Sequence, residues 1–423
     1  MLNNMRRRVV VTGLGVVAAN GTGKEAFWDA TSKGNSGIQP ISRFSTENLP
    51  IQVAGEVKHL VVEQYINRKL AHHTDRMTHF ALVAIEEALQ DAKLSLDQEN
   101  LQRVGAVIAN SLGGVEFVIE QIAALYLRGP RAMSPYTAIA WLHVSNVGQA
   151  SVRYGIQGYC KTPVNDTVGG LDAMGMAYNA IQRGAADVII AGGCEAPVYS
   201  YLLFILGQSD YSVTGSDPHA YRPFDRRANG LLLGEGAGIC ILEEYEHARQ
   251  RGATIYGEIT GYGQTTDAHG PRGVPADGAQ YARAMRLAMQ EVNILPENIA
   301  YFSLDGRALP PFDASEFDAL SRTFGAGLER LPVSVPRTML GHSYAAAGAL
   351  DTITTLLALK HNLVPPTINC EELDPRYELN LVRNEARPLE YRGATQSALI
   401  GGRGTGGTNV VLAIKKMPRG EAA

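Results

Sequence analysis

The sequence predicts a layered α/β fold whose strands are mainly buried. The main observation is that short apolar runs rich in β-branched residues alternate with amphipathic helical stretches along the whole chain. The second is size and composition. The chain has 423 residues, 45% of them hydrophobic and 19% charged, which suits a large core or two fused α/β units.

Nine of the apolar runs are predicted to be strands, because each is short and apolar. In chain order they are residues 8–12, 104–109, 188–191, 238–242, 255–261, 300–304, 333–335, 398–401 and 409–414. Helices are expected between them. The two clearest helices are residues 75–92 and 278–292, in which apolar side chains recur at helical spacing on one face. Those side chains are Met77, Phe80, Ala81, Ala84, Ile85, Ala88 and Leu89 in the first and Tyr281, Met285, Ala288 and Met289 in the second.

The chain is expected to consist of two related halves, residues 1–250 and 251–423. Each half offers a strand, a tight turn and a helix of small residues, at 165–181 and at 337–359. No linker rich in Pro, Gly or Ser separates the halves, and the changeover at 246–254 is a charged helix end, so they should form one compact unit. Any two α/β halves can look alike at this level, so the duplication alone does not establish the division.

Composition and charge exclude several classes of function. A formal net charge of −4 and a pI near 6.2 provide no overall basic field for nucleic acid or for an anionic membrane. No apolar run approaches the roughly 18 residues of a membrane span, so a soluble, cytoplasmic protein is expected. The grouping of His72, His73, Asp75 and His79 is better explained as a polar helix start than as metal ligands. No metal site is therefore predicted.

Several glycine-rich motifs follow one another in a distinctive order. They are residues 8–15 (RVVVTGLG), 165–173 (NDTVGGLDA), 191–196 (AGGCEA), 222–225 (RPFD), 234–238 (GEGAG), 341–343 (GHS) with the small residues 345–349, and 404–409 (GTGGTN). Each motif is weak alone, but together they resemble the β-ketoacyl-acyl-carrier-protein synthases of the thiolase superfamily. This resemblance covers nearly the whole chain, and it implies a five-layered α-β-α-β-α fold and a dimer.

Active members of that family use a Cys, two His and a Lys, and this chain keeps one of the four. Thr167 stands at the Cys position, Asp305 at the first His, Arg337 at the Lys, and His342 is retained, while Arg403 replaces an apolar residue of the gating turn. A thiolate at a helix N-terminus is nucleophilic near neutral pH, whereas a threonine hydroxyl needs a base. An ionised Asp305 would also repel a developing enolate. We therefore expect no condensing activity and no catalytic residue in this chain.

Within the family, this pattern of loss resembles the chain-length factors, or ketosynthase β subunits, of type II polyketide synthases. The resemblance implies a heterodimer with a Cys-containing ketosynthase α subunit and a role in shaping the tunnel in which the polyketide grows. Chain-length factors typically carry Gln at the position of Thr167. Positions that match the tunnel wall of the family are Leu112, Val115, Ile119, Tyr136 and Thr137. The resemblance implies no cofactor bound by this chain, since phosphopantetheine is carried by a partner acyl carrier protein.

Two alternatives remain open from the sequence. Thr167, His342 and Asp305 supply the hydroxyl, imidazole and carboxylate of an independent acyltransferase or hydrolase, with the backbone amides of Thr167 and Arg403 as an oxyanion hole. Against this, Asp305 and Arg337 can simply pair as a salt bridge that fills a dead site. The other alternative is a homodimeric, non-elongating scaffold.

Overall fold

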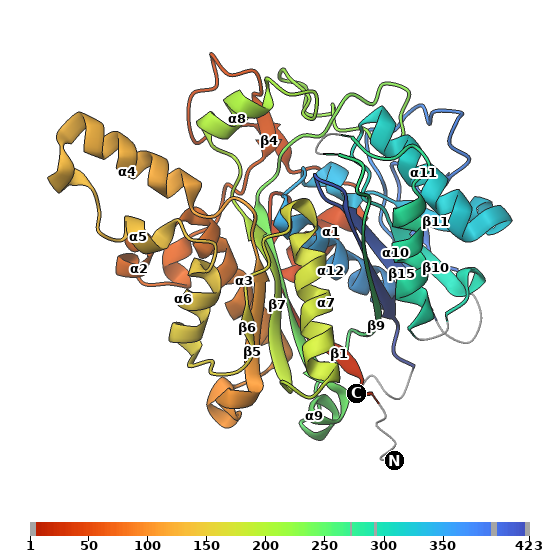
Figure 1. Ribbon diagram of the computed structural model, residues 1–423, viewed down its shortest axis with the longest axis horizontal. Helices are drawn as coiled ribbons and strands as arrows, with labels where there is room; N and C mark the ends of the chain where they lie inside the picture. The colour runs from red at the N-terminus through yellow and green to blue at the C-terminus, as the bar shows by residue number, and fades with distance from the viewer. Residues whose placement is uncertain (1–5, 271–272, 292–293, 391–395, 419–423) are drawn as a thin grey trace.

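The computed structural model describes residues 6–270, 273–291, 294–390 and 396–418, and its main feature is one large mixed sheet (Figure 1). The strands lie in the order β13-β11-β10-β15-β16-β9-β1-β8-β7-β5-β6, with β2 paired to β1. Their bounds are β1 Val9–Ala18, β2 Gly21–Thr22, β5 Val104–Ala109, β6 Cys160–Lys161, β7 Val188–Glu195, β8 Gly236–Glu244, β9 Gly257–Thr266, β10 Ile299–Ser303, β11 Pro332–Ser334, β13 Asn380–Leu381, β15 Ser397–Arg403 and β16 Thr408–Lys415.

Two small sheets lie outside the large one, and helices cover it. The small sheets pair β3 Ile38–Pro40 with β4 Val53–Gly55 and β12 Leu363–Val364 with β14 Arg387–Pro388. The helices are α1 Lys24–Ser32, α2 Arg68–His73, α3 Arg76–Ala92, α4 Val115–Arg128, α5 Thr137–Ala140, α6 Ser145–Tyr154, α7 Gly169–Gln182, α8 Ser200–Leu206, α9 Tyr245–Gln250, α10 Ala279–Gln290, α11 Pro310–Phe324 and α12 Ala345–His361.

The helices and the sheet form five layers. α7 and α12 pack against each other and lie between the two parts of the sheet, since both contact β7 and β8 on one side and α7 contacts β16 and α12 contacts β15 on the other. α3 covers the outer side of β1 and β8, and α10 covers the outer side of β9 and β16. The fold predicted from the resemblance is therefore confirmed (Figure 1).

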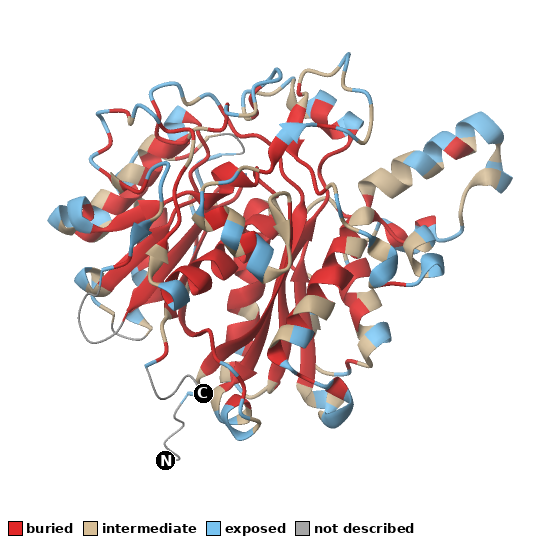
Figure 2. Ribbon diagram, turned by 180° about the vertical axis from the view of Figure 1, so that it is seen from behind, coloured by how far each residue is buried: buried red, intermediate tan, exposed pale blue. Residues whose placement is uncertain are grey.

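The central helix α12 shows why such a sequence forms an inner layer. Every residue from Ala345 to Leu359 is buried, as expected for a helix that is apolar all round and covered on all sides. The close approach of α12 to α7 and β7 depends on small residues. A Cβ on Gly170 of α7 would lie 2.4 Å from the Ala345 carbonyl oxygen, and one on Gly193 of β7 would lie 2.3 Å from it. Figure 2 shows the resulting core as a continuous buried region through the sheet and the inner helices.

All nine predicted strands exist, and the sequence placed their centres better than their ends. The predicted strand 104–109 coincides with β5, whereas β1 runs on to Ala18 through glycines that lie close against α3. The predicted helix 75–92 is α3, with Asp75 as its N-cap, and 278–292 is α10, although Val292 lies outside the described residues. The turn at 165–168 is a 3₁₀ turn, and the nearest strand is the two-residue β6.

The two halves share the large sheet, which joins them where β1 pairs with β9. Their division at residue 250 falls at the end of α9 and stays a prediction. Within the described part of the chain, none of the helices has both the length and the apolar character that crossing a bilayer requires.

One segment leaves the body of the molecule. α4 projects outward and the chain returns through residues 129–136 to the short helix α5, forming an arm (Figure 1). Near the outer end of the arm, Tyr126 and Leu127 are each 83% exposed.

Candidate active site

The turn that carries Thr167 lies where several chain segments meet. Asp166 takes a left-handed backbone conformation (φ 46°), which turns the chain sharply into α7 and places Thr167 just before the helix. The loop after β10 brings Asp305 and the end of β15 brings Arg403 to the same region. The side chain of Thr167 is buried, with 5% of its surface exposed.

The hydroxyl of Thr167 is already engaged on both sides. Its oxygen lies 2.7 Å from the Arg403 carbonyl oxygen and 3.2 Å from Asp166 Oδ2, so either can accept its proton. The same oxygen accepts a hydrogen bond from Arg307 Nη2 at 2.7 Å. Asp166 Oδ2 in turn accepts from the Thr405 amide at 2.6 Å. Thr167 therefore faces a permanent cation that cannot accept its proton.

Arg307 is the residue that sequence reasoning missed. Its guanidinium is 2% exposed, donates to Asp305 Oδ2 at 2.9 Å and to the Arg403 carbonyl oxygen, and lies over the ring of Phe312. The signal available in the sequence was a second charged residue only two positions after Asp305. The sequence alone did not indicate that this side chain turns inward toward Thr167.

Asp305 is shared between two arginines. Besides Arg307, it contacts Arg337, whose Nη1 lies 2.8 Å from Asp305 Oδ1, and Arg337 also donates from Nε to Asp351 at 2.6 Å. The expected ion pair between Asp305 and Arg337 is thus present. Burial alone would raise the pKa of Asp305, but the charges of Arg307 and Arg337 outweigh it and hold that pKa below the usual range. Asp305 is therefore an ionised carboxylate.

His342 is turned toward Arg337 and away from Thr167. Its Nε2 lies 3.2 Å from Arg337 Nη1, and its Nδ1 lies 3.2 Å from the Tyr344 amide nitrogen, which donates to it. Burial and the neighbouring charges of Arg337 and Arg307 lower the pKa of His342 well below its usual value, so the imidazole is neutral. Among the described residues, no hydrogen bond joins His342 to Thr167 or to Asp305.

Arg403, expected in the gating turn, is also buried, with 1% of its surface exposed. Its guanidinium contacts the Phe312 carbonyl oxygen (3.3 Å), Ser315 Oγ (3.2 Å) and Asn409 Oδ1 (3.3 Å). It lies over the ring of Tyr281 at 5.2 Å from the centroid. The side chain points into the C-terminal half and not toward Thr167.

Two buried guanidinium groups, those of Arg307 and Arg337, therefore lie among Thr167, Asp305 and His342, where a condensing enzyme needs a nucleophile and neutral donors. The hydroxyl, imidazole and carboxylate of the alternative triad lie close together, but arginines stand between them. For a triad, the base must contact the nucleophile and the carboxylate must contact the base. Neither contact exists here.

The five positions assigned to the tunnel wall fall into separate places. Leu112, Val115 and Ile119 each pack against a buried cluster that includes Tyr199 and Ala308, and partly buried Tyr344 packs against the same cluster. Ala308 and Tyr344 each lie one or two residues from site residues. Tyr136 is instead 38% exposed and stacks on His73, with ring centroids 3.6 Å apart. Thr137 is buried in the first turn of α5, where its hydroxyl donates to the Ser134 carbonyl oxygen.

Within the described ranges, no three His, Cys, Asp or Glu side chains are placed to hold a metal ion. His72 and His73 end α2, a helix end where a helix start was expected, and His79 contacts the Ala71 carbonyl oxygen.

Comparison with known proteins shows the family. Residues 6–248 match the family described as beta-ketoacyl synthase, N-terminal domain, and residues 256–371 match beta-ketoacyl synthase, C-terminal domain. The chain belongs to the β-ketoacyl synthase family. It is 38% identical over 410 residues to the tetracenomycin polyketide synthase ketoacyl synthase beta subunit of Streptomyces glaucescens, covering 96% of this chain and 98% of that one. It is therefore a homologue of a polyketide synthase ketosynthase β subunit.

The chain is also similar to condensing enzymes and to solved complexes. It is 36% identical over 414 residues to 3-oxoacyl-(acyl-carrier-protein) synthase 2 of Staphylococcus aureus, covering 98% of this chain and 99% of that one. The ishigamide ketosynthase/chain length factor matches with a TM-score of 0.90 at 30% identity over 98% of this chain and 100% of its own. A type II polyketide acyl-carrier protein in complex with its ketosynthase bound to the hexaketide matches with a TM-score of 0.87 at 29% identity over 98% and 100%.

Proposed function

We propose that this chain is the non-elongating β subunit of a type II polyketide synthase. It pairs with a Cys-containing ketosynthase α subunit and shapes the tunnel that sets polyketide length. The observation that carries the proposal is the pair of buried arginines, Arg307 and Arg337, that share Asp305 at the former catalytic site, within an otherwise complete ketosynthase body. Such a body without a thiol, and with Thr167 bonded to Arg307 and not hydrogen-bonded to His342, suits a partner role better than a condensing role.

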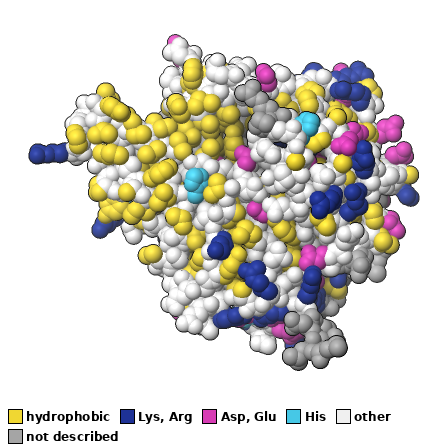
Figure 3. All heavy atoms as spheres, viewed as in Figure 1, with side chains coloured by type: hydrophobic (Ala, Val, Ile, Leu, Met, Phe, Trp, Pro, Cys, Tyr) yellow, Lys and Arg dark blue, Asp and Glu magenta, His cyan; other side chains and the backbone are white. Residues whose placement is uncertain are grey.

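The surface of the arm supports the proposal of a partner. Among the described residues, all but two of the large hydrophobic side chains that are markedly exposed fall between residues 122 and 205. Figure 3 shows hydrophobic side chains gathered over the arm and the adjoining body. We call these residues the apolar face: Ile122, Tyr126, Leu127, Tyr136, Ile139, Trp141, Val144, Val152, Val164, Tyr201, Phe204 and Ile205. Exposed hydrophobic side chains gathered on one side of a molecule are typical of an interface.

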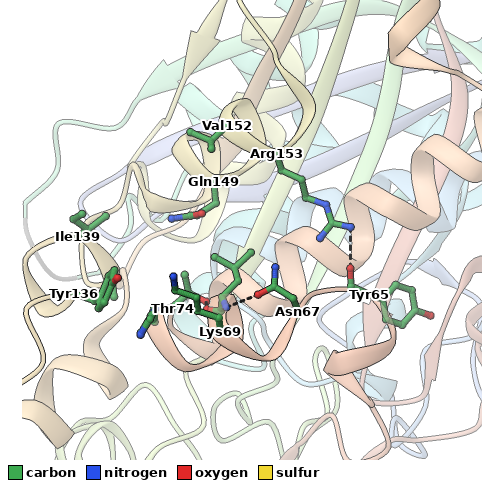
Figure 4. Close-up of a pocket in the computed structure, with 12 residues that line it drawn as sticks. Tyr65, Asn67, Lys69, Thr74, Tyr136, Ile139, Gln149, Val152 and Arg153 are labelled. Carbon is green, nitrogen blue, oxygen red and sulfur yellow. Dashed lines mark hydrogen bonds between the residues drawn. The ribbon is translucent and has the colours of Figure 1, made fainter.

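A hollow in the apolar face offers a place for side chains of the partner. It has a volume of roughly 570 Å³ and lies between α2, α5 and α6 (Figure 4). Leu70, Ile139 and Val152 contribute apolar wall, and the stacked rings of His73 and Tyr136 line it. Such a hollow suits apolar or aromatic side chains, which supply much of the binding free energy of an interface.

The sheet also ends near this face. β6 is the last strand in the sheet order, and exposed Val164 follows it. An open sheet edge beside exposed apolar residues favours a partner that extends the sheet. We expect the α and β subunits to bury more than about 2,000 Å² in total, as obligate partners commonly do.

The acyl carrier protein is the second proposed partner. A solved neighbour contains a type II polyketide acyl-carrier protein in complex with its ketosynthase. By analogy, the carrier brings the phosphopantetheine-bound chain to the cysteine of the α subunit. This chain then needs no cofactor of its own, because its part is to bound the tunnel.

Co-expression with an α subunit tests this function. We expect a one-to-one complex by native mass spectrometry, and polyketide from malonyl donor and carrier protein only when both subunits are present. Each subunit assayed alone is the control for the pair. A stable homodimer that makes product unaided would contradict the proposal, and a stable homodimer without activity would favour the scaffold alternative.

A further inference from the structure

Two buried carboxylates from other parts of the chain hold the root of the arm, residues 111–117. Glu195, the last residue of β7, accepts hydrogen bonds on its two oxygens from the amides of Ser111 at 2.7 Å and Leu112 at 3.2 Å. Its side chain is fully buried. A single carboxylate therefore fixes two consecutive amides at the start of the root.

Asp75 holds the other end of the root. One of its oxygens accepts from the amide of Phe117, in the first turn of α4, at 3.0 Å, and the other accepts from the amide of Met77 in α3 at 2.8 Å. Asp75 is 3% exposed. This carboxylate thus ties the beginning of the arm to the outer helix that covers the sheet.

Leu112 and Val115 lie on or between these two points of attachment, and the intervening glycines leave little room for movement. Gly113 has a φ of 67°. A Cβ on Gly114 would lie 2.2 Å from the Ala140 carbonyl oxygen, so α5 packs directly on the root. The root is fixed while the outer end of the arm is exposed.

The root is also connected to the former catalytic site. The hydroxyl of Ser111 donates to the carbonyl oxygen of Asp166 at 2.6 Å, which is the residue before Thr167. Leu112 and Val115 pack against the cluster that contains Ala308, the residue after Arg307, and Tyr344 packs against the same cluster. The position of the root therefore sets how Leu112 and Val115 lie relative to the site that contains Arg307 and Arg337.

Burying carboxylates in this way carries a cost. Burial raises the pKa of Asp75 and of Glu195, because it disfavours the charged form, while the hydrogen bonds from backbone amides lower the pKa and favour the carboxylate that accepts on both oxygens. Apolar residues of similar volume would avoid this cost, but they could not specify where the backbone amides lie. The proposed function makes no use of either carboxylate in chemistry.

We propose that Asp75 and Glu195 are positioning residues, which fix the tunnel wall at Leu112 and Val115 and thereby set the length of the polyketide. This inference rests on the proposed function. Within it, the two carboxylates act through the backbone of the root and do not touch the growing chain.

Glu195→Gln tests the inference at nearly constant volume. A glutamine has one acceptor oxygen, so its amino group must face the amide of Ser111 or of Leu112, and one hydrogen bond is lost. In the reconstituted pair we expect total malonyl consumption to stay within about threefold of the parent. The product should shift by at least one two-carbon unit or spread over several lengths. Asp75→Asn should act in the same direction through the amide of Phe117.

Glu120→Gln is the matched control, because Glu120 is an exposed carboxylate on α4, the helix that begins in the root. It should leave both the amount and the length of product unchanged. Unchanged melting temperature and unchanged assembly of the variants show that a shift in length does not come from unfolding.

The outcomes separate this inference from the proposed function. If Leu112→Phe changes the product length while folded Glu195→Gln and Asp75→Asn give the parental length, the inference is wrong and the proposed function stands. If none of the three changes the length, the proposed tunnel role is wrong. Should the carboxylate variants fail to fold, hydrogen exchange of the parental pair decides. The amides of Ser111, Leu112 and Phe117 should exchange as slowly as those of β7, and fast exchange would overturn the inference.

Discussion

Replacing Asp305 with alanine is expected to destabilise this protein by roughly 3–5 kcal/mol, the largest stability effect that the site predicts. The carboxylate is fully buried and is shared by Arg307 and Arg337 at 2.9 Å and 2.8 Å. Its removal leaves two buried guanidinium groups without their common counter-charge. Denaturant unfolding of the purified protein, at fixed concentration and in the same oligomeric state as the parent, measures this change.

Asp29→Ala is the control for that experiment. Asp29 pairs with Lys33 at 2.7 Å on the surface, where more than 60% of each side chain is exposed. Exposed pairs contribute little, so no measurable change is expected. If Asp305→Ala is as stable as this control, the arginines do not form the closed, charge-paired site described above.

Changing Leu112 to phenylalanine is expected to shorten the polyketide by at least one two-carbon unit. Leu112, like Val115 and Ile119, packs against the cluster that includes Tyr199 and Ala308. A close-packed wall does not yield to added volume without strain, of about 1–3 kcal/mol, so the space available to the growing chain falls. The products released by the reconstituted pair, analysed by mass spectrometry, give the length directly.

Leu295→Phe provides the same substitution at an exposed position, where 55% of the residue is accessible. It should give the parental product. If folded, assembled Leu112→Phe also gives the parental product, this wall does not measure the chain. Tyr136 is a useful comparison, because it lines the hollow beside His73 and not the cluster that contains Leu112.

The strands could be predicted because buried strands in a layered fold are continuous apolar runs, and β5 and β7 are buried at every position. The order of the strands could not be derived from such runs, since pairing depends on contacts between residues far apart in the chain. The sheet joins β1 to both β8 and β9, residues separated by more than 200 positions. Resemblance to a family, and not periodicity, supplied that level of the fold.

Motif spacing assigned Thr167, Asp305, Arg337, His342 and Arg403 to the former catalytic site and its gating turn. That these residues lack catalytic roles stays a prediction. The sequence could not predict the direction in which each side chain points. Arg307 points inward to Thr167, and Arg403 points away from it. Side-chain direction is set by backbone conformation and by nearby acceptors, and a spacing pattern contains neither.

The same holds for the wall of the tunnel. Leu112 and Tyr136 are both assigned by position, yet the arm separates their surroundings, because α4 leaves the body between them. Asp75 was assigned to a polar helix start and Glu195 to the motif 191–196, but neither pattern indicated that these carboxylates hold the root. Each carboxylate accepts a hydrogen bond from the backbone amide of a residue more than 40 positions away in the sequence.

The proposed role as a non-elongating subunit depends most directly on where the growing polyketide is attached. Intact-protein mass spectrometry of the reconstituted pair, incubated with acyl-loaded carrier protein, measures this for each subunit separately. We predict acyl adducts on the α subunit alone, and product formation by the pair carrying Thr167→Ala within a few-fold of the parent, because no covalent step is lost. An acyl adduct mapped to Thr167, together with a loss of about 10³-fold or more in the Thr167→Ala pair, would contradict the account and establish this chain as an acyltransferase in its own right.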